Sequence, residues 1–203
     1  ENARSALKDA LARRGEPSAE VLDGNKMHYF RVRRLIQGEP LVSIIIPLKD
    51  KPWLLTKCIH AIQIQSSYDN YEIICVSNDS TSPILYDALA NFSKQDSRIR
   101  MLELNQGFNF SLVVNAGVQQ AKGEHILLLN NDIEVLSGDW IESLLEHSQR
   151  ANVAAVGGKL FYPDNTIQHA GIVHGLGGYA GHIHKNFPAY HEGYFNRLQL
   201  VQN

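Results

Sequence analysis

The stretch LVSIIIPLKDKPWLLTKCIHAI, residues 41–62, decides the fold, because it joins a strand directly to a helix. Residues 42–47 form a nearly unbroken run of β-branched side chains, which is typical of a strand buried on both faces. From Pro52 onward the apolar residues recur three and four positions apart, a spacing that predicts an amphipathic helix. The residues on that apolar face are Leu54, Leu55, Cys58, Ile59 and Ile62.

The same alternation of strand and helix continues along the chain. Ser82 is expected to cap a helix that Pro83 begins. The other expected elements are strands at 71–77, 99–104, 125–129 and 153–162, and helices at 109–121 and 138–149. Strands alternating with helices favour parallel pairing through right-handed crossovers, so the sequence predicts an α/β fold.

The two ends of the chain differ from this regular middle. Residues 1–40 are interpreted as an N-terminal helical extension and linker, with a helix over 3–14 and an extended segment at 29–36. Its arginines at 31, 33 and 34 are expected to face water. Beyond Tyr162, glycine and histidine become frequent and helical periodicity is lost, which predicts loops and short antiparallel strands. Residues 41–203 are therefore assigned to one domain, and both ends of the chain look cut rather than natural.

Composition excludes several classes of protein. Lys plus Arg number 19 and Asp plus Glu 21, a net charge of −2, which argues against a nucleic-acid binder working through a basic face. Two cysteines without paired spacing fit a reducing compartment. No apolar run approaches the ~20 residues of a membrane helix. We therefore expect a cytoplasmic location, free or peripheral to the inner face of the membrane.

Polar residues follow the predicted strands where each strand ends, and the carboxyl ends of parallel strands are where such sheets bind ligands. Asp132, just after the apolar run at 125–129, could hold a hard divalent cation. Asn and Asp also make turns at strand ends, and Asp50 could cap the helix that begins at Pro52. The residues alone leave open whether these side chains bind a ligand or cation, or only form turns and helix caps.

From Leu41 onward the chain resembles the family-2 glycosyltransferases, which use nucleotide-sugar donors and have a GT-A-type fold. The resemblance covers residues 41–62, YEIICVSNDST at 71–81 and GFNFSLVVNAGVQQAKGEHILLLNNDIEV at 107–135. The segment IQHAGIVHGLGGYAGHIHK at 167–185 is similar to a branch associated with bacterial surface polysaccharides. The resemblance to this family implies a Rossmann-like three-layer sandwich with a mostly parallel central sheet and a Gly/His-rich loop region at the C-terminal end.

The resemblance also implies roles for particular residues. Asp132 and Asn130 would hold Mn²⁺ or Mg²⁺, although Asn130 and Ser77 stand where the family has acids, which leaves Asp132 as the only charged ligand. The residues implied for the donor are Pro47, Lys49, Asp50, Ser77, Asn78, Asp79, Asn109, Asn115, Asn130, Asn131 and His169.

The implied activity is an inverting, metal-assisted transfer of a sugar from a nucleotide-diphosphate donor to a hydroxyl of a glycan or glycolipid. Such a reaction needs a general base to deprotonate the acceptor. That base is expected beyond Asn203, so the fragment alone could bind a donor and transfer nothing. The alternative is a non-catalytic nucleotide-binding or scaffold domain of the same fold, which the changes at Ser77 and Asn130 favour.

Overall fold

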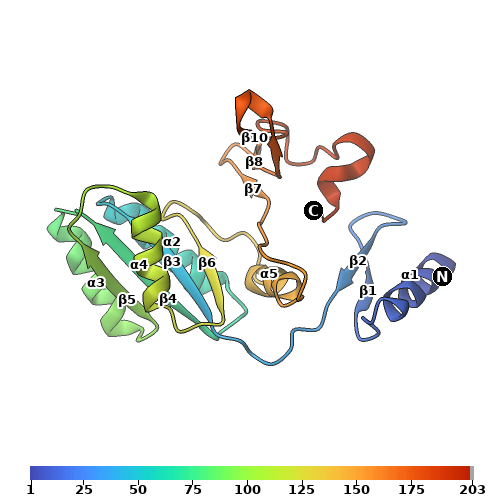
Figure 1. Cartoon of the computed structure of the whole chain (residues 1–203), viewed down its shortest axis with the longest axis horizontal. Coiled ribbons are helices and arrows are strands. Elements are labelled where there is room, and N and C mark those ends of the chain that lie inside the picture. Colours follow the sequence, from blue (N-terminus) through green and yellow to red (C-terminus); the bar gives the residue numbers. More distant parts are fainter. Residues whose placement is uncertain (202–203) are drawn as a thin grey trace. The chain divides into compact units, whose positions relative to one another are not determined.

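The computed structural model describes residues 1–201, which form two compact units (Figure 1). The first unit is Glu1–Val153 and the second runs from Ala154 onward. The N-terminal segment belongs to the first unit. The division into an N-terminal extension over 1–40 and a domain over 41–203 stays a prediction.

The first unit contains a four-stranded parallel sheet, as the sequence predicted. Its strands are β3 (Val42–Leu48), β4 (Tyr71–Asn78), β5 (Ile99–Leu104) and β6 (His125–Leu128), in the spatial order β5-β4-β3-β6. The expected α/β class is therefore confirmed. The strand order reverses between β3 and β6, since the chain first winds toward β5 and then returns to the other side of β3.

Helices cover both faces of this sheet and make three layers (Figure 1). α2 (Pro52–Gln65), α3 (Pro83–Gln95) and α5 (Trp140–Ser148) bury their apolar residues against one face. α4 (Phe110–Gln120) packs on the other face, where Val113 meets the side chains of β3 and β4. The longest helix in residues 1–201 has 14 residues, and none in that range combines the length and hydropathy needed to cross a bilayer.

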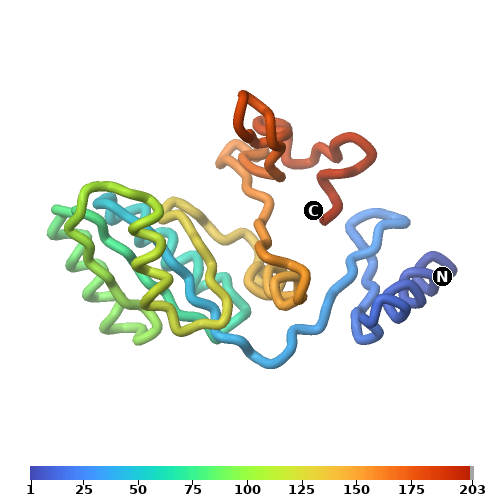
Figure 2. The backbone as a smooth tube through the Cα atoms, viewed as in Figure 1, coloured from blue at the N-terminus to red at the C-terminus, as the bar shows by residue number. Residues whose placement is uncertain are grey.

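The N-terminal segment is a helix followed by a hairpin. α1 (Asn2–Arg13) confirms the helix predicted there, while β1 (Glu20–Asp23) pairs antiparallel with β2 (Phe30–Arg33). The sequence indicated extended structure around β2 but not its partner. Figure 2 shows the backbone running on from β2 into the sheet without another helix or strand.

The second unit consists of loops and short antiparallel strands, as expected. β7 (Leu160–Phe161) pairs with β8 (Ile167–His169), and β9 (Ile172–His174) pairs with β10 (Ala180–His182). Two 3-10 helices, η1 (Leu176–Gly178) and η2 (Tyr194–Gln199), complete it.

The strand expected over 153–162 is wrong except for the two residues of β7. Its apolar composition is interrupted by Gly157 and Gly158, which weaken a strand because they have no side chains to pack. Within the described residues, no neighbouring strand pairs with 153–159.

Candidate functional site at the carboxyl edge of the sheet

Polar residues from three strands gather at the carboxyl edge of the sheet. Lys49 and Asp50 follow β3, Ser77 and Asn78 end β4, and residues 130–132 come just after β6. Because all four strands are parallel, these ends lie on one edge. The edge includes the point between β3 and β6 where the strand order reverses, the usual ligand position in open parallel sheets.

The Asp50 carboxylate joins two loops of this edge. Its Oδ1 accepts hydrogen bonds from the backbone N–H groups of Thr81 at 2.8 Å and Ser82 at 2.9 Å, and these bonds lower the pKa of Asp50. Asp50 therefore holds the two residues that precede α3. The alternative that it caps the helix after Pro52 is wrong, because its carboxylate bonds this other loop instead. Ser82 occupies the N-cap position of α3, as predicted, although its hydroxyl makes no capping bond. A role for Asp50 in donor binding stays a prediction.

The end of β4 carries buried polar atoms without a partner. Ser77 is fully buried and Asn78 is 2% exposed, yet Ser77 Oγ and Asn78 Oδ1 accept and donate no hydrogen bond within the described chain. The Asn78 amide nitrogen is occupied, because Nδ2 donates to Asp79 Oδ2 at 3.1 Å. A buried polar atom without a partner costs free energy, so these two atoms mark the place where a ligand or a water would bond.

The turn after β6 presents oxygen donors to solvent. Asp132 is exposed, and within residues 1–201 no hydrogen bond or ion pair engages its side chain or that of Asn130 or Asn131. One carboxylate and two amide oxygens are the hard ligands that Mg²⁺ and Mn²⁺ accept. The same described residues contain no cluster of three or more His, Cys, Asp or Glu side chains able to enclose a metal. The donor set therefore fits an open cation site whose other ligands are water and phosphate oxygens.

The remaining predicted residues of this unit have simpler surroundings. Asn109 caps α4, since its Oδ1 accepts the backbone N–H of Leu112 at 3.1 Å, and Asn115 is exposed farther along the helix. Pro47 lies opposite Val76, beyond the residues of β3 that pair with β6, so its missing N–H breaks no β6 hydrogen bond. Lys49 is exposed beside Asp50. Asn109 and Lys49 thus share the carboxyl edge with the residues above.

His169 belongs to the second unit and lies in β8. Its Nδ1 is 2.7 Å from Nδ1 of His182 in β10, and the two rings meet edge to face. Burial, together with the neighbouring His182, lowers the pKa of His169, so its ring stays neutral to a lower pH than a free histidine. Its predicted contact with the donor stays a prediction.

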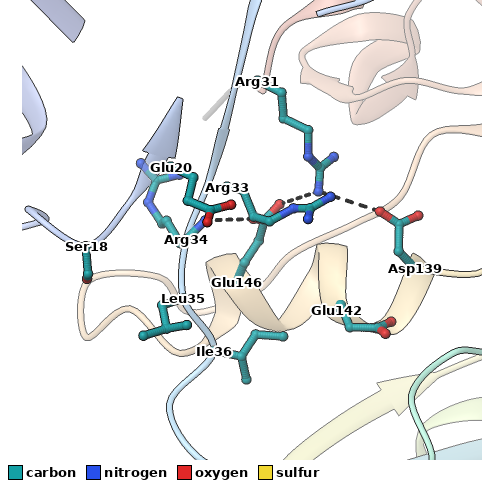
Figure 3. Close-up of a pocket in the computed structure, with 10 residues that line it drawn as sticks. All are labelled: Ser18, Glu20, Arg31, Arg33, Arg34, Leu35, Ile36, Asp139, Glu142 and Glu146. Carbon is teal, nitrogen blue, oxygen red and sulfur yellow. Dashed lines mark hydrogen bonds and ion pairs between the residues drawn. The ribbon is translucent and has the colours of Figure 1, made fainter. Parts of the chain in front are cut away.

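A charged cavity of about 360 Å³ lies elsewhere, between the N-terminal segment and α5 (Figure 3). Glu146, which is 5% exposed, accepts from Arg31 Nη2 at 3.0 Å and from the backbone N–H of Arg34 at 2.9 Å. Arg31 and the Arg34 backbone therefore hold the segment to α5. The expectation of exposure is wrong for the Arg34 side chain, which pairs with Glu16 at 2.8 Å, whereas Arg33 is exposed and Arg31 stays 41% exposed despite its ion pair. Sequence reasoning missed this cluster because its partners are 112 and 115 residues apart.

Comparisons with known proteins agree on one family. The family model described as Glycosyl transferase family 2 matches residues 43–198. An uncharacterized protein, y4gI of Sinorhizobium fredii, is 41% identical over the whole chain, which spans 22% of that protein. The O-antigen biosynthesis protein RfbC of Myxococcus xanthus is 43% identical over 87% of the chain and 14% of its own length. The chain thus spans less than a quarter of these relatives.

A solved structure shares the fold. The mannosyltransferase PcManGT of Pyrobaculum calidifontis, in complex with GDP-Man and Mn²⁺, superposes with a TM-score of 0.56 at 15% identity. The match covers 81% of this chain and 45% of that one. It supports the expected GT-A-type, Rossmann-like architecture.

Proposed function

The chain belongs to glycosyl transferase family 2, and from this premise we propose that it binds a nucleotide-diphosphate sugar and takes part in transferring that sugar to a hydroxyl group. The observation that carries the proposal is the pair of buried, unpartnered atoms Ser77 Oγ and Asn78 Oδ1, which lie at the same edge of the sheet as the free carboxylate of Asp132. A nucleoside needs hydrogen-bonding groups, and a diphosphate needs a cation. This edge of the sheet offers residues for both.

In the proposed complex, Ser77, Asn78 and Asp79 bond the base and ribose, with Pro47, Lys49 and Asp50 lining the same pocket. Asp132 holds Mn²⁺ or Mg²⁺ with Asn130, and Asn131 lies between them in the turn. When bound, the cation neutralises charge that develops on the departing diphosphate. Asn109 and Asn115 complete the donor contacts proposed for the first unit, and the expected contact of His169 with the donor stays a prediction.

The proposed reaction is a single displacement with inversion. An acceptor hydroxyl oxygen forms a bond to the anomeric carbon, the bond from that carbon to the diphosphate oxygen breaks, and a general base takes the hydroxyl proton. We assign no described residue to that base, and the proposal covers donor binding by the described residues.

We propose that the acceptor is a growing bacterial surface polysaccharide or its glycolipid carrier. RfbC is named for O-antigen biosynthesis. A second relative, from Campylobacter jejuni, is named GalNAc(5)-diNAcBac-PP-undecaprenol beta-1,3-glucosyltransferase and is 38% identical over 49% of this chain and 32% of its own length. Such carriers are lipid-linked, which supports a cytoplasmic enzyme working near the inner face of the membrane.

Thermal unfolding with Mn²⁺ and uridine, thymidine or guanosine diphosphates tests donor binding. A ligand at about 100 times its dissociation constant raises the melting temperature by roughly 5–10 °C for a domain of this size. Asn78→Ala should reduce this shift with and without Mn²⁺, because Asn78 is assigned to the nucleoside and not to the cation. Asn91→Ala, an exposed asparagine on α3, is the matched control and should behave like the parent.

The second candidate is a non-catalytic domain that keeps the fold. It is favoured by Ser77 and Asn130, which stand where the resemblance led us to expect acids. A parent protein that shows no melting shift with any of these nucleotides would support this alternative and contradict donor binding.

A further inference from the structure

The turn that presents Asp132 is held from beneath by a buried thiol of α2. Cys58 Sγ lies 3.7 Å from the carbonyl oxygen of Asn130 and donates to it. Asn130 is the first residue of the turn, two positions before Asp132. The thiol therefore bonds the backbone where the turn begins.

The thiol lies inside the protein. Cys58 is 1% exposed, so its contact with the Asn130 carbonyl is shielded from water. A thiol has one weak S–H donor, and this carbonyl oxygen accepts it.

Neighbouring residues of α2 hold the rest of the same loop. Lys57 Nζ forms an ion pair with Glu134 Oε1 at 2.6 Å. At the end of α2, Ser66 Oγ accepts from Trp140 Nε1 at 2.8 Å, and Ser67 Oγ donates to the Gly138 carbonyl at 2.8 Å. The Lys57–Glu134 pair is exposed and contributes little. Cys58 is the α2 contact that lies directly on the turn.

We propose that Cys58 is a positioning residue, which fixes the backbone of residues 130–133 so that the Asp132 carboxylate is presented to the diphosphate-bound cation. This inference rests on the proposed function for the cation but adds a role for a core residue that touches neither donor nor metal. A thiol suits the task because it both donates and accepts weakly while packing as a small apolar group.

The second cysteine provides a matched control. Cys75 in β4 is also fully buried, but no hydrogen bond joins it to residues 130–133 in the described structure. Valine fills a similar volume without hydrogen bonding, and serine keeps the donor and acceptor. The informative set is therefore Cys58→Val, Cys58→Ser and Cys75→Val, with Cys58→Ala replacing the valine variant if that one does not fold.

The first measurement is backbone hydrogen exchange of residues 130–134 in the ligand-free protein. Losing one modest hydrogen bond should speed exchange there about fivefold in Cys58→Val. Cys58→Ser should return toward the parent rate, and Cys75→Val should leave these amides unchanged. Unchanged exchange in Cys58→Val, or an equal change in both valine variants, would overturn the inference.

The second measurement is the affinity for nucleotide in the presence of Mn²⁺. In Cys58→Val, the gain in nucleotide affinity that Mn²⁺ gives should fall about fivefold, and nucleotide binding without Mn²⁺ should not change. Cys58→Ser should recover the gain. Faster exchange of the turn with an unchanged Mn²⁺ dependence would also overturn the positioning role. If the parent binds no nucleotide, the proposed function fails instead, and the exchange data still report on whether Cys58 holds the turn.

Discussion

Asp50 Oδ1 lies 2.9 Å from the backbone nitrogen of Ser82, so the loop after β3 bonds the N-cap residue of a helix that follows β4. In return, Ser80 Oγ accepts the backbone N–H of Asp50 at 3.1 Å. The backbone is in the left-handed region at Asp50 (φ 51°), Lys51 (φ 52°) and Asp79 (φ 50°), conformations that persist only where the surroundings enforce them. These reciprocal bonds hold the two loops that carry the proposed base pocket.

Replacing Asp50 by alanine should lower the melting temperature and weaken nucleotide binding, because the N–H groups of Thr81 and Ser82 lose their acceptor and the loops separate. Asp50→Asn keeps an amide oxygen as acceptor and should restore most of the stability. Differential scanning calorimetry with nucleotide titration measures both effects. Equal behaviour of the alanine variant and the parent would show that the cap is unimportant.

Asp132→Ala should abolish the Mn²⁺-dependent part of the nucleotide-induced melting shift while leaving the ligand-free melting temperature nearly unchanged. The reason is that Asp132 is exposed and, among the described residues, its side chain has no bonded partner to lose. Asp87→Ala removes an exposed carboxylate from α3 and serves as control. A mutant that keeps the parent's Mn²⁺ dependence would mean that Asp132 only forms the turn.

Glu146→Ala should release the N-terminal segment from α5. The substitution removes a buried carboxylate that bonds both Arg31 and the Arg34 backbone. Because the Arg31 side chain is 41% exposed, we expect the free energy of unfolding to fall by about 1–2 kcal/mol, less than for a fully buried pair. Urea unfolding measures the loss, and limited proteolysis should reveal new cuts within residues 14–37. Asp139→Ala removes a half-exposed Arg31 partner at 3.8 Å and a 3.4 Å hydrogen bond from Ser143 Oγ, and it should leave the digestion pattern intact.

Gly117→Ala should destabilise the protein by about 1–3 kcal/mol through overpacking. A Cβ at Gly117 would lie 2.5 Å from Ile45 Cγ2 and 2.9 Å from Val76 Cγ2, so α4 must move away from the sheet. At Gly107 an added Cβ meets nothing within 4 Å, and Gly107→Ala should change the free energy of unfolding by less than about 0.5 kcal/mol. Similar unfolding midpoints for the two variants would refute the tight contact.

Asp96 should contribute stability that disappears in acid. Hydrogen bonds from Arg98 in particular lower its pKa from 3.8 to about 2. Since the folded-state pKa is below the unfolded value, the contribution is complete above about pH 4 and is lost as the pH falls toward 2. Urea midpoints of the parent and Asp96→Asn should therefore differ at pH 6 and converge near pH 2. A constant difference across this range would contradict the assignment.

Local pattern was enough to predict most elements of the first unit. The β-branched run of β3 and the three-and-four spacing of α2 are properties of neighbouring residues, so they can be recognised without knowing the fold. The alternation of such segments then predicted the parallel sheet, and the sheet predicted which edge collects the polar residues. The strand expected at 153–162 failed because a strand needs a pairing partner as well as a composition.

The sequence by itself thus determined the fold class, the family and the set of residues at the carboxyl edge. Only the tertiary structure decided what each of those residues does there: the Asp50 carboxylate bonds the loop before α3, the Asp132 carboxylate is free, and Cys58 bonds the turn that carries Asp132. The physical reason is that hydrogen bonds and ion pairs depend on distances between atoms, and between residues as far apart as Arg31 and Glu146 those distances exist only after the chain has folded.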